Sequence, residues 1–186
     1  TKSSRHFFYD SAICASTSMR LKTDRGLRKA IYGIYLAMFS ASKTCPNDFH
    51  RGRLTTILTG VMGIEDEGWR VVGITREALD LLAESEFAKP VVARQLCRGH
   101  LIDRSRTAAL LFERASPVRQ PDFFRVFLEN DRTVIMLPSQ NPARHRGEFP
   151  AYIPFENPEA ELFSNGSLMG WKHRPRERDF LRELHT

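Results

Sequence analysis

Stretches with helical periodicity alternate along the chain with short apolar runs. Apolar residues recur at helical spacing from Gly26 to Lys43, and a shorter helix is expected over 54–62. Further helices are predicted over 76–86, 105–114, 123–129 and from Pro175 onward. Strands are predicted over 69–74, 132–137 and, because of its prolines, at a sheet edge over 152–155. The segment 91–96 fits a strand or a short helix equally well.

The first long helix has the clearest two-sided pattern. We expect Ile31, Ile34 and Tyr35 to face the core, and Arg28 and Lys29 to face solvent. Across the chain, the apolar side of each periodic segment predicts one common core. Its expected members are Val71, Ile74, Leu79, Leu82, Leu111, Phe112, Val134, Met136 and Phe180.

Polar residues stand where helix caps are expected. Asp24 precedes the first long helix and Thr75 precedes the helix over 76–86, and both residue types favour the N-cap position. Helices and strands are mixed without regular βαβ alternation, which favours the α+β class. We therefore expect residues 1–186 to form a single mixed domain with a small sheet and about five to six helices.

The distribution of charge is more informative than the net charge of +6. Residues 1–60 carry ten Lys and Arg against three Asp, whereas residues 61–93 are acidic. A basic N-terminal part suggests an anionic partner, DNA or RNA first. No apolar run is long enough for a membrane helix, and we expect no membrane contact.

The cysteines indicate a reducing compartment. Cys14, Cys45 and Cys97 are odd in number and widely spaced, which argues against a disulfide framework or a zinc knuckle. We expect all three to be small buried residues and the protein to be cytoplasmic. The sequence also lacks the P-loop, HExxH and GxSxG motifs, so the enzyme classes that those motifs define are not indicated.

Two polar segments could carry chemistry. In the first, 98–104, His100 could act as a general base while Arg98 and Arg104 hold phosphate oxygens. On a strand, their even spacing would place all three side chains on one face. The second, 138–146, combines an amide, an imidazole and two guanidinium groups just after a strand, and its candidates are Asn141, His145, Arg144 and Arg146.

Together these segments resemble nucleases of the ββα-metal class, also called His-Me or HNH-type. The run Arg98-Gly99-His100 is similar to the Asp-Arg-Gly-His run of the non-specific branch, with Cys97 in place of Asp. The resemblance implies that His100 is the base, Asn141 the orienting amide and His145 a residue beside a Mg²⁺ ion. Asp103 is a second candidate ligand of that metal.

Simpler interpretations stay open for the same residues. His100 could be a solvent-facing or core histidine, and Asp103 could cap the helix that follows it. Asn141 stands before a proline, as turn residues often do, and Asn130-Asp131 reads as a turn between a helix and a strand.

A further basic cluster follows Trp171. Lys172 and Arg174 could grip phosphate, or this segment could be the solvated start of the last helix. The candidate nucleic-acid contacts are therefore Arg25, Arg28, Lys29, Arg98, Arg104, Arg144, Arg146, Lys172 and Arg174.

Three functional hypotheses follow from these patterns. The first is a nucleic-acid-acting enzyme, most concretely a Mg²⁺-dependent endonuclease with His100 as its base. The second is a non-catalytic DNA-binding module that acts as a regulator or accessory factor. The third is a protein-interaction or effector domain whose arginines meet an acidic partner protein.

Overall fold

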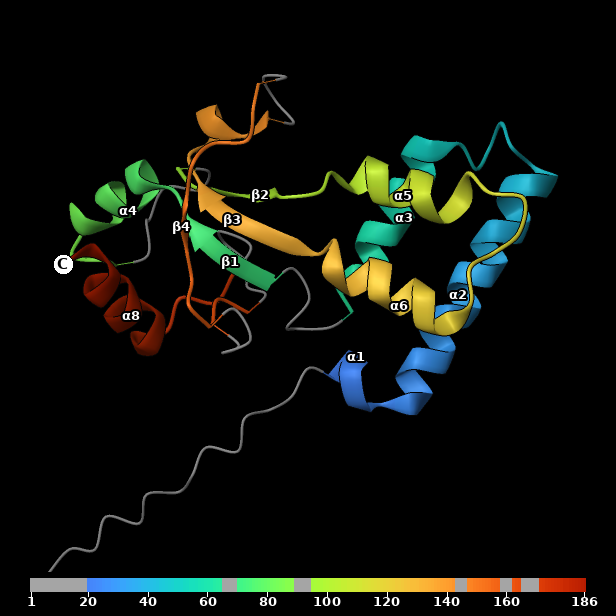
Figure 1. Ribbon diagram of the computed structural model, residues 1–186, viewed down its shortest axis with the longest axis horizontal. Coiled ribbons are helices and arrows are strands. Elements are labelled where there is room, and N and C mark those ends of the chain that lie inside the picture. Colours follow the sequence, from blue (N-terminus) through green and yellow to red (C-terminus); the bar gives the residue numbers. More distant parts are fainter. Residues whose placement is uncertain (1–19, 65–69, 89–94, 143–146, 158–161, 165–170) are drawn as a thin grey trace, which may run out of the picture.

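The computed structural model describes residues 20–64, 70–88, 95–142, 147–157, 162–164 and 171–186. These residues form seven α-helices and a four-stranded mixed sheet, which confirms the α+β class (Figure 1). In chain order the elements are α1 (Arg20–Thr23), α2 (Arg25–Thr44), α3 (Arg51–Met62), β1 (Arg70–Ile74), α4 (Arg76–Ala83), β2 (Cys97–His100), α5 (Arg104–Phe112), α6 (Gln120–Glu129), β3 (Arg132–Met136), the short 3₁₀ helix η1 (Pro138–Gln140), β4 (Ile153–Pro154) and α8 (Pro175–His185). None of the helices in these ranges is long and apolar enough to cross a membrane.

The strand order in the sheet is β2-β3-β1-β4. The central strands β1 and β3 are parallel, and the edge strands β2 and β4 each pair antiparallel with their neighbour. This confirms the edge position predicted for 152–155. Gly73 allows β4 to approach β1, because a Cβ atom at this position would lie 2.7 Å from the carbonyl oxygen of Ile153.

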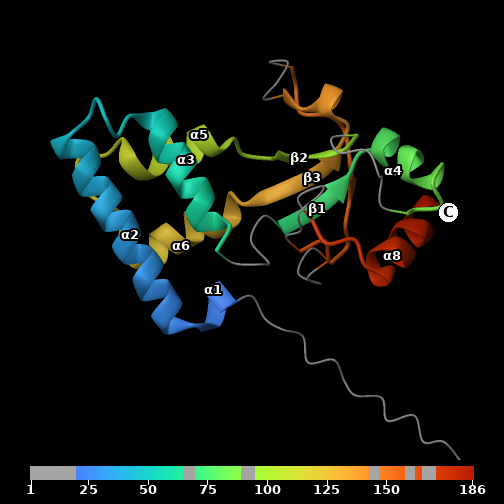
Figure 2. The same ribbon diagram turned by 180° about the vertical axis from the view of Figure 1, so that it is seen from behind.

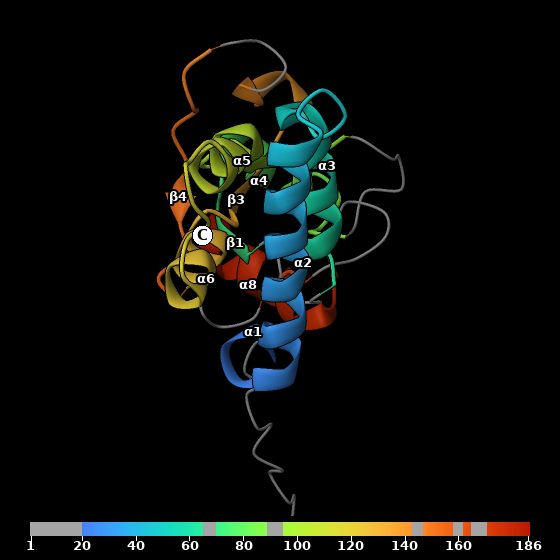
Figure 3. The same cartoon turned by 90° about the vertical axis from the view of Figure 1, so that its right-hand side faces the viewer.

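The helices divide into two groups around the sheet. Figures 1 and 2 show α2, α3, α5 and α6 gathered beyond one end of the sheet, with α4 and α8 at its other end. We call the group of α2, α3, α5 and α6 the bundle. Viewed from its side, α2 runs along the outside of the bundle (Figure 3). The chain passes between the bundle and the sheet where β2 leads into α5 and where α6 leads into β3.

The buried side chains form three clusters rather than the single core expected from the sequence. The bundle has its own cluster, in which the Tyr35 and Phe123 rings stack at 4.7 Å. A second cluster fills the space between the sheet, α4 and α8, and a third covers the opposite face of the sheet. Eight of the nine predicted core residues are buried, and Phe180 is half-buried against the second cluster. The prediction of a single core was wrong because each amphipathic group satisfies its own apolar face.

Helix α2 confirms most of the prediction for 26–43. The Asp24 carboxylate accepts the Leu27 N–H at 2.9 Å and caps the helix, and Ile31 and Tyr35 are buried. Ile34 was predicted to face the core but is 38% exposed, because it is offset from the narrow line of Ile31, Tyr35 and Met38.

Other local predictions are corrected or confirmed by the structure. Thr75 caps α4 through the Ala78 N–H, as predicted. The helix ends at Ala83 instead of 86, since Glu86 and Phe87 have positive φ angles of 52° and 59° that a right-handed helix does not allow.

The cysteine prediction was wrong for the two described cysteines. Cys45 is exposed just after α2 and Cys97 is half-buried, while Cys14 lies outside the described residues. Cys45 follows the last turn of its helix at the surface, where no other element covers it. Of the ambiguous segment 91–96, only Gln95 and Leu96 are described, and the strand begins at Cys97.

Candidate functional site

A cavity of about 340 Å³ lies where the sheet meets the helical bundle. It is bounded by the end of β2, the start of α5 and parts of the chain after η1. The residues that line it are Arg98, His100, Leu101, Asp103, Arg104, Asn141, Pro142 and Phe149. Five of these eight were candidate site residues in the sequence, so two segments about forty positions apart contribute to one cavity.

Strand β2 positions Arg98 and His100. The two residues are separated by Gly99, so their side chains leave the strand on the same face. The strand ends at His100, although the Leu101 N–H still donates to the Arg132 carbonyl at 3.0 Å. The expectation that one strand carries Arg98, His100 and Arg104 was therefore wrong for the third residue.

Arg104 reaches the cavity from the first turn of α5. Asp103 accepts the Ser105 N–H at 2.6 Å and caps this helix, as the simpler sequence interpretation expected. The Arg104 guanidinium donates to the hydroxyl of Thr59 on α3 at 2.8 Å. The turn between β2 and α5, together with this anchor, gives the arginine its place in the cavity.

Asp131 stands beside His100, and the sequence did not indicate this partner. His100 Nε2 lies 3.8 Å from Asp131 Oδ1, and the two side chains are only 8% and 5% exposed. The pairing of His100 with Thr133 makes Asp131 a diagonal neighbour of the histidine on the same face of the sheet. An acidic residue directly before the apolar strand β3 is visible in the sequence. Which side chain it contacts, however, depends on which strand pairs with β3.

The buried Asp131 carboxylate interacts with both arginines that line the cavity. Burial lowers the pKa of Arg98 to about 10, while the Asp131 carboxylate raises it and the Arg104 cation lowers it. Burial also lowers the pKa of Arg104, against the opposing effect of Asp131 and then of Asp103. Both guanidinium groups nevertheless remain protonated near neutral pH.

Asp103 is also ionised. The hydrogen bond from Ser105 lowers the pKa of its carboxyl group, although burial opposes this shift. Asp131 is not among the residues that line the cavity. The lining therefore holds two cations and one anion beside the imidazole, which favours an anionic ligand.

Asn141 also lines the cavity. It follows η1, where the Gln140 side-chain oxygen accepts the Thr75 hydroxyl at 2.8 Å and the Leu137 N–H at 3.0 Å. The Asn141 amide nitrogen lies 3.8 Å from the sulfur of Cys97. His100 and Asn141 thus both line the cavity, whereas His145, Arg144 and Arg146 lie outside the described residues.

The predicted metal site lies only partly within the described residues. No group of three or more His, Cys, Asp or Glu side chains in these ranges could hold an ion. The Asp103 carboxylate caps α5 through one of its oxygens. His145, the other candidate ligand, is not described.

Among the described residues, the other candidate nucleic-acid contacts, which are Arg25, Arg28, Lys29, Lys172 and Arg174, do not line this cavity. Arg25 and Lys29 are exposed on α2. Arg28, predicted to face solvent, is half-buried because it donates to the Leu21 carbonyl at 2.7 Å and lies 4.0 Å from the centre of the Phe124 ring.

The basic cluster after Trp171 is largely part of the fold. Arg174 ion-pairs with Glu177, whose side chain is fully buried and also accepts the Phe163 N–H at 3.2 Å. Lys172 is half-buried next to this network.

Comparison of the chain with models of protein families, with curated proteins and with solved structures gave no match in any of the three.

Proposed function

We propose that this protein binds nucleic acid through its phosphate backbone and hydrolyses a phosphodiester bond at the His100 cavity. The observation that supports this proposal most directly is that Arg98, His100 and Arg104 line one cavity while Asp131 is buried behind the imidazole. A phosphodiester needs positive groups to hold its oxygens and a base to activate water, and these residues can supply both.

The geometry supports a role for each group in such a reaction. An imidazole that directs its Nε2–H toward Asp131 carries its lone pair on Nδ1, and this nitrogen would accept a proton from the attacking water. The separation of 3.8 Å is longer than a hydrogen bond, and contacts of this kind often shorten when substrate binds. The new P–O bond forms as the bond to the leaving oxygen breaks, and that oxygen then takes a proton from solvent.

The arginines would stabilise the negative charge that develops on the non-bridging oxygens of the phosphate. Guanidinium groups donate two parallel hydrogen bonds to phosphate, which a lysine cannot do. Asn141 also lines the cavity and could orient the water or the phosphate. A volume of about 340 Å³ is sufficient for a single phosphate and part of its sugars, so the rest of a nucleic acid would extend over the surface.

Mg²⁺ belongs to this proposal as a candidate cofactor. It would be held by Asp103 and His145, and it would lower the pKa of bound water and neutralise phosphate charge. We expect the reaction to take place in the cytoplasm, as the cysteine pattern indicates.

The second candidate function is a binding module without catalysis. The same cavity would then hold a phosphate, and the exposed Arg25 and Lys29 would add backbone contacts elsewhere. The buried Asp131 carboxylate raises the pKa of both cavity arginines. This interaction favours the alternative, since it also gives the charged residues a structural role between the bundle and the sheet.

A plasmid-cleavage assay with Mg²⁺, Mn²⁺ or EDTA, run beside a gel shift, tests the proposal. We expect His100→Ala to lower cleavage by about 10²–10⁴-fold with little change in DNA affinity. The control is His185→Ala, which removes an exposed imidazole on α8 and should leave both unchanged.

Variants of the arginines test phosphate binding separately. Arg104→Lys and Arg98→Lys keep the charge, which protects the fold, but should weaken binding and cleavage together. Full cleavage by His100→Ala would exclude it as the base. Binding without cleavage under any of these conditions would establish the binding module, and no binding at low salt would refute both candidates.

A further inference from the structure

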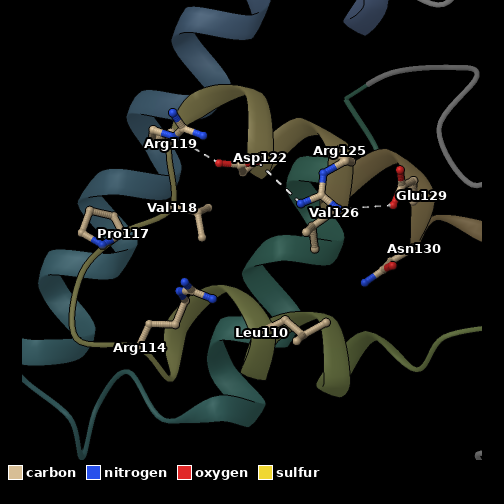
Figure 4. Close-up of a pocket in the computed structure, with 10 residues that line it drawn as sticks. All are labelled: Leu110, Arg114, Pro117, Val118, Arg119, Asp122, Arg125, Val126, Glu129 and Asn130. Atoms are coloured by element: carbon tan, nitrogen blue, oxygen red, sulfur yellow. Dashed lines mark hydrogen bonds and ion pairs between the residues drawn. The ribbon is translucent and has the colours of Figure 1, made fainter.

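A second hollow lies between α5 and α6, away from the His100 cavity. Its volume is about 630 Å³. Figure 4 shows Leu110 and Arg114 on the α5 side, the α6 side chains opposite, and Val118 on the connecting segment pointing into the space between. None of the residues that line it also lines the His100 cavity.

The floor of this groove is apolar and open. Leu110 is 47% exposed, which is unusual for a leucine within a concave surface. Val118 and Val126 are half-buried beside it. The three side chains would lose solvent contact together if an apolar surface covered them.

The rim of the groove is charged, and its acidic residues already have partners. Asp122 pairs with Arg119 at 3.3 Å and with Arg125 at 3.6 Å, and Arg125 also approaches Glu129 at 4.0 Å. These ion pairs are drawn in Figure 4. The acids of α6 are thus neutralised by arginines of the same helix and segment.

The α5 side of the groove carries excess positive charge. Arg114 lines the hollow, and Arg106 lies one turn before Leu110 on the same face of α5. Both are exposed, and within the described part of the chain neither forms an ion pair. An occupant with carboxylates would find complementary charge here.

Buried hydrogen bonds fix the shape of this groove. The Tyr35 hydroxyl donates to the Leu111 carbonyl at 3.0 Å and accepts the Val118 N–H at 2.9 Å. The Tyr32 hydroxyl donates to the Val118 carbonyl at 2.8 Å. At the other end, the Asn130 amide donates to Thr107 at 3.0 Å and ties α6 to α5. A preformed groove loses little conformational entropy when it binds.

We propose that the groove between α5 and α6 docks an acidic amphipathic helix of a partner protein. Apolar residues on one face of that helix would cover Leu110, Val118 and Val126, and flanking carboxylates would reach Arg106 and Arg114. Helices of nine and ten residues border the groove, so its length of about 15 Å accommodates about ten residues of such a helix. A nucleic acid would use the arginines but would leave the exposed Leu110 unexplained.

The probe is a fluorescent synthetic peptide with leucines at helical spacing on one face and glutamates elsewhere, measured by anisotropy. We expect saturable binding that weakens about tenfold with Leu110→Ser and with Arg114→Glu. Both side chains are exposed, so these variants should fold like the parent. A peptide with every glutamate replaced by lysine should not bind.

Matched variants outside the groove complete the test. Ile64→Ser removes a leucine-sized side chain that is 49% exposed, and Arg53→Glu reverses an exposed charge on α3. Neither should change peptide affinity, and His100→Ala should not either, which keeps this site independent of the proposed reaction. The proposal is wrong if the acidic peptide shows no binding at about 1 mM, if the groove variants bind it normally, or if the lysine peptide binds as well. It is also wrong if only Arg114→Glu weakens binding while a DNA oligonucleotide displaces the peptide, because the groove would then be a nucleic-acid surface.

Discussion

His100 and Asp131 face each other across the junction of β2 and β3, with Nε2 and Oδ1 3.8 Å apart and both side chains nearly inaccessible to solvent. The histidine also lines the cavity, whereas the aspartate does not. The imidazole thus lies between a buried carboxylate and the cavity. The same carboxylate acts on Arg98 and Arg104, the two arginines among the described residues that line the cavity.

A double-mutant cycle tests whether the two residues act as a unit. We expect His100→Gln to lower kcat for cleavage by about 10²–10⁴-fold and Asp131→Asn to lower it by at least about tenfold. The double variant should be no slower than His100→Gln alone if Asp131 acts on the reaction through the imidazole, whereas a further loss would mean that it also acts through Arg98 and Arg104. Circular dichroism and thermal melting of each variant serve as controls for folding. Losses that multiply in the double variant would show that Asp131 acts independently of His100.

The basic start of α2 gives a prediction about salt. Arg25→Ala and Lys29→Ala should each reduce the slope of log K against log salt by about 0.9 on duplex DNA if the exposed side chain contacts a phosphate. Arg28→Ala should chiefly lower the melting temperature, since this guanidinium bonds the Leu21 carbonyl and covers the Phe124 ring. Slopes that stay unchanged in the first two variants would place the DNA surface elsewhere.

Glu177 gives a prediction about pH. Burial by itself raises the pKa of this carboxyl group, but hydrogen bonds from Arg174, the Phe163 N–H and Arg176 outweigh it and hold the pKa below its usual range. A carboxyl group with a lowered pKa in the folded state adds stability above its unfolded pKa of about 4.3 and loses it as pH falls through the folded value. Glu177→Gln should therefore cost about 2–4 kcal/mol at neutral pH and weaken the loss of stability on acidification below about pH 5.

Urea unfolding followed from neutral pH to about pH 3 measures this effect. The matched control is Glu183→Gln on the same helix, whose side chain is exposed and should leave the pH dependence unchanged. An equal pH dependence of the parent and Glu177→Gln would contradict the prediction.

Ile31 and Ile34 form a natural pair for testing the orientation of α2. Ile31→Ala should reduce the free energy of unfolding by about 2–5 kcal/mol, because its side chain is 1% exposed within the bundle cluster. Ile34→Ala should change it by no more than about 0.5 kcal/mol, since Ile34 is already 38% exposed. Chemical denaturation of both variants provides the measurement, and similar losses would mean that Ile34 is covered in solution.

Local sequence determined the features that depend on neighbours along the chain. Asp24 and Thr75 cap their helices because a side-chain oxygen reaches an N–H three residues later, a contact set by local spacing alone. The apolar run at 132–136 was likewise sufficient to predict β3, and the prolines of 152–155 to predict an edge strand. Asp103 as a helix cap belongs to the same class of local feature.

Only the tertiary structure decided which distant residues meet. The partner of His100 depends on the antiparallel register of β2 and β3, and periodicity along one segment carries no information about register between two. Arg104 reaches the cavity through the turn after β2 and its bond to Thr59, which no spacing rule predicts. The apolar pattern was right about burial for eight of its nine predicted core residues but assigned them to one core instead of three clusters. Burial depends on each residue's own face, whereas membership of a cluster depends on how whole elements pack.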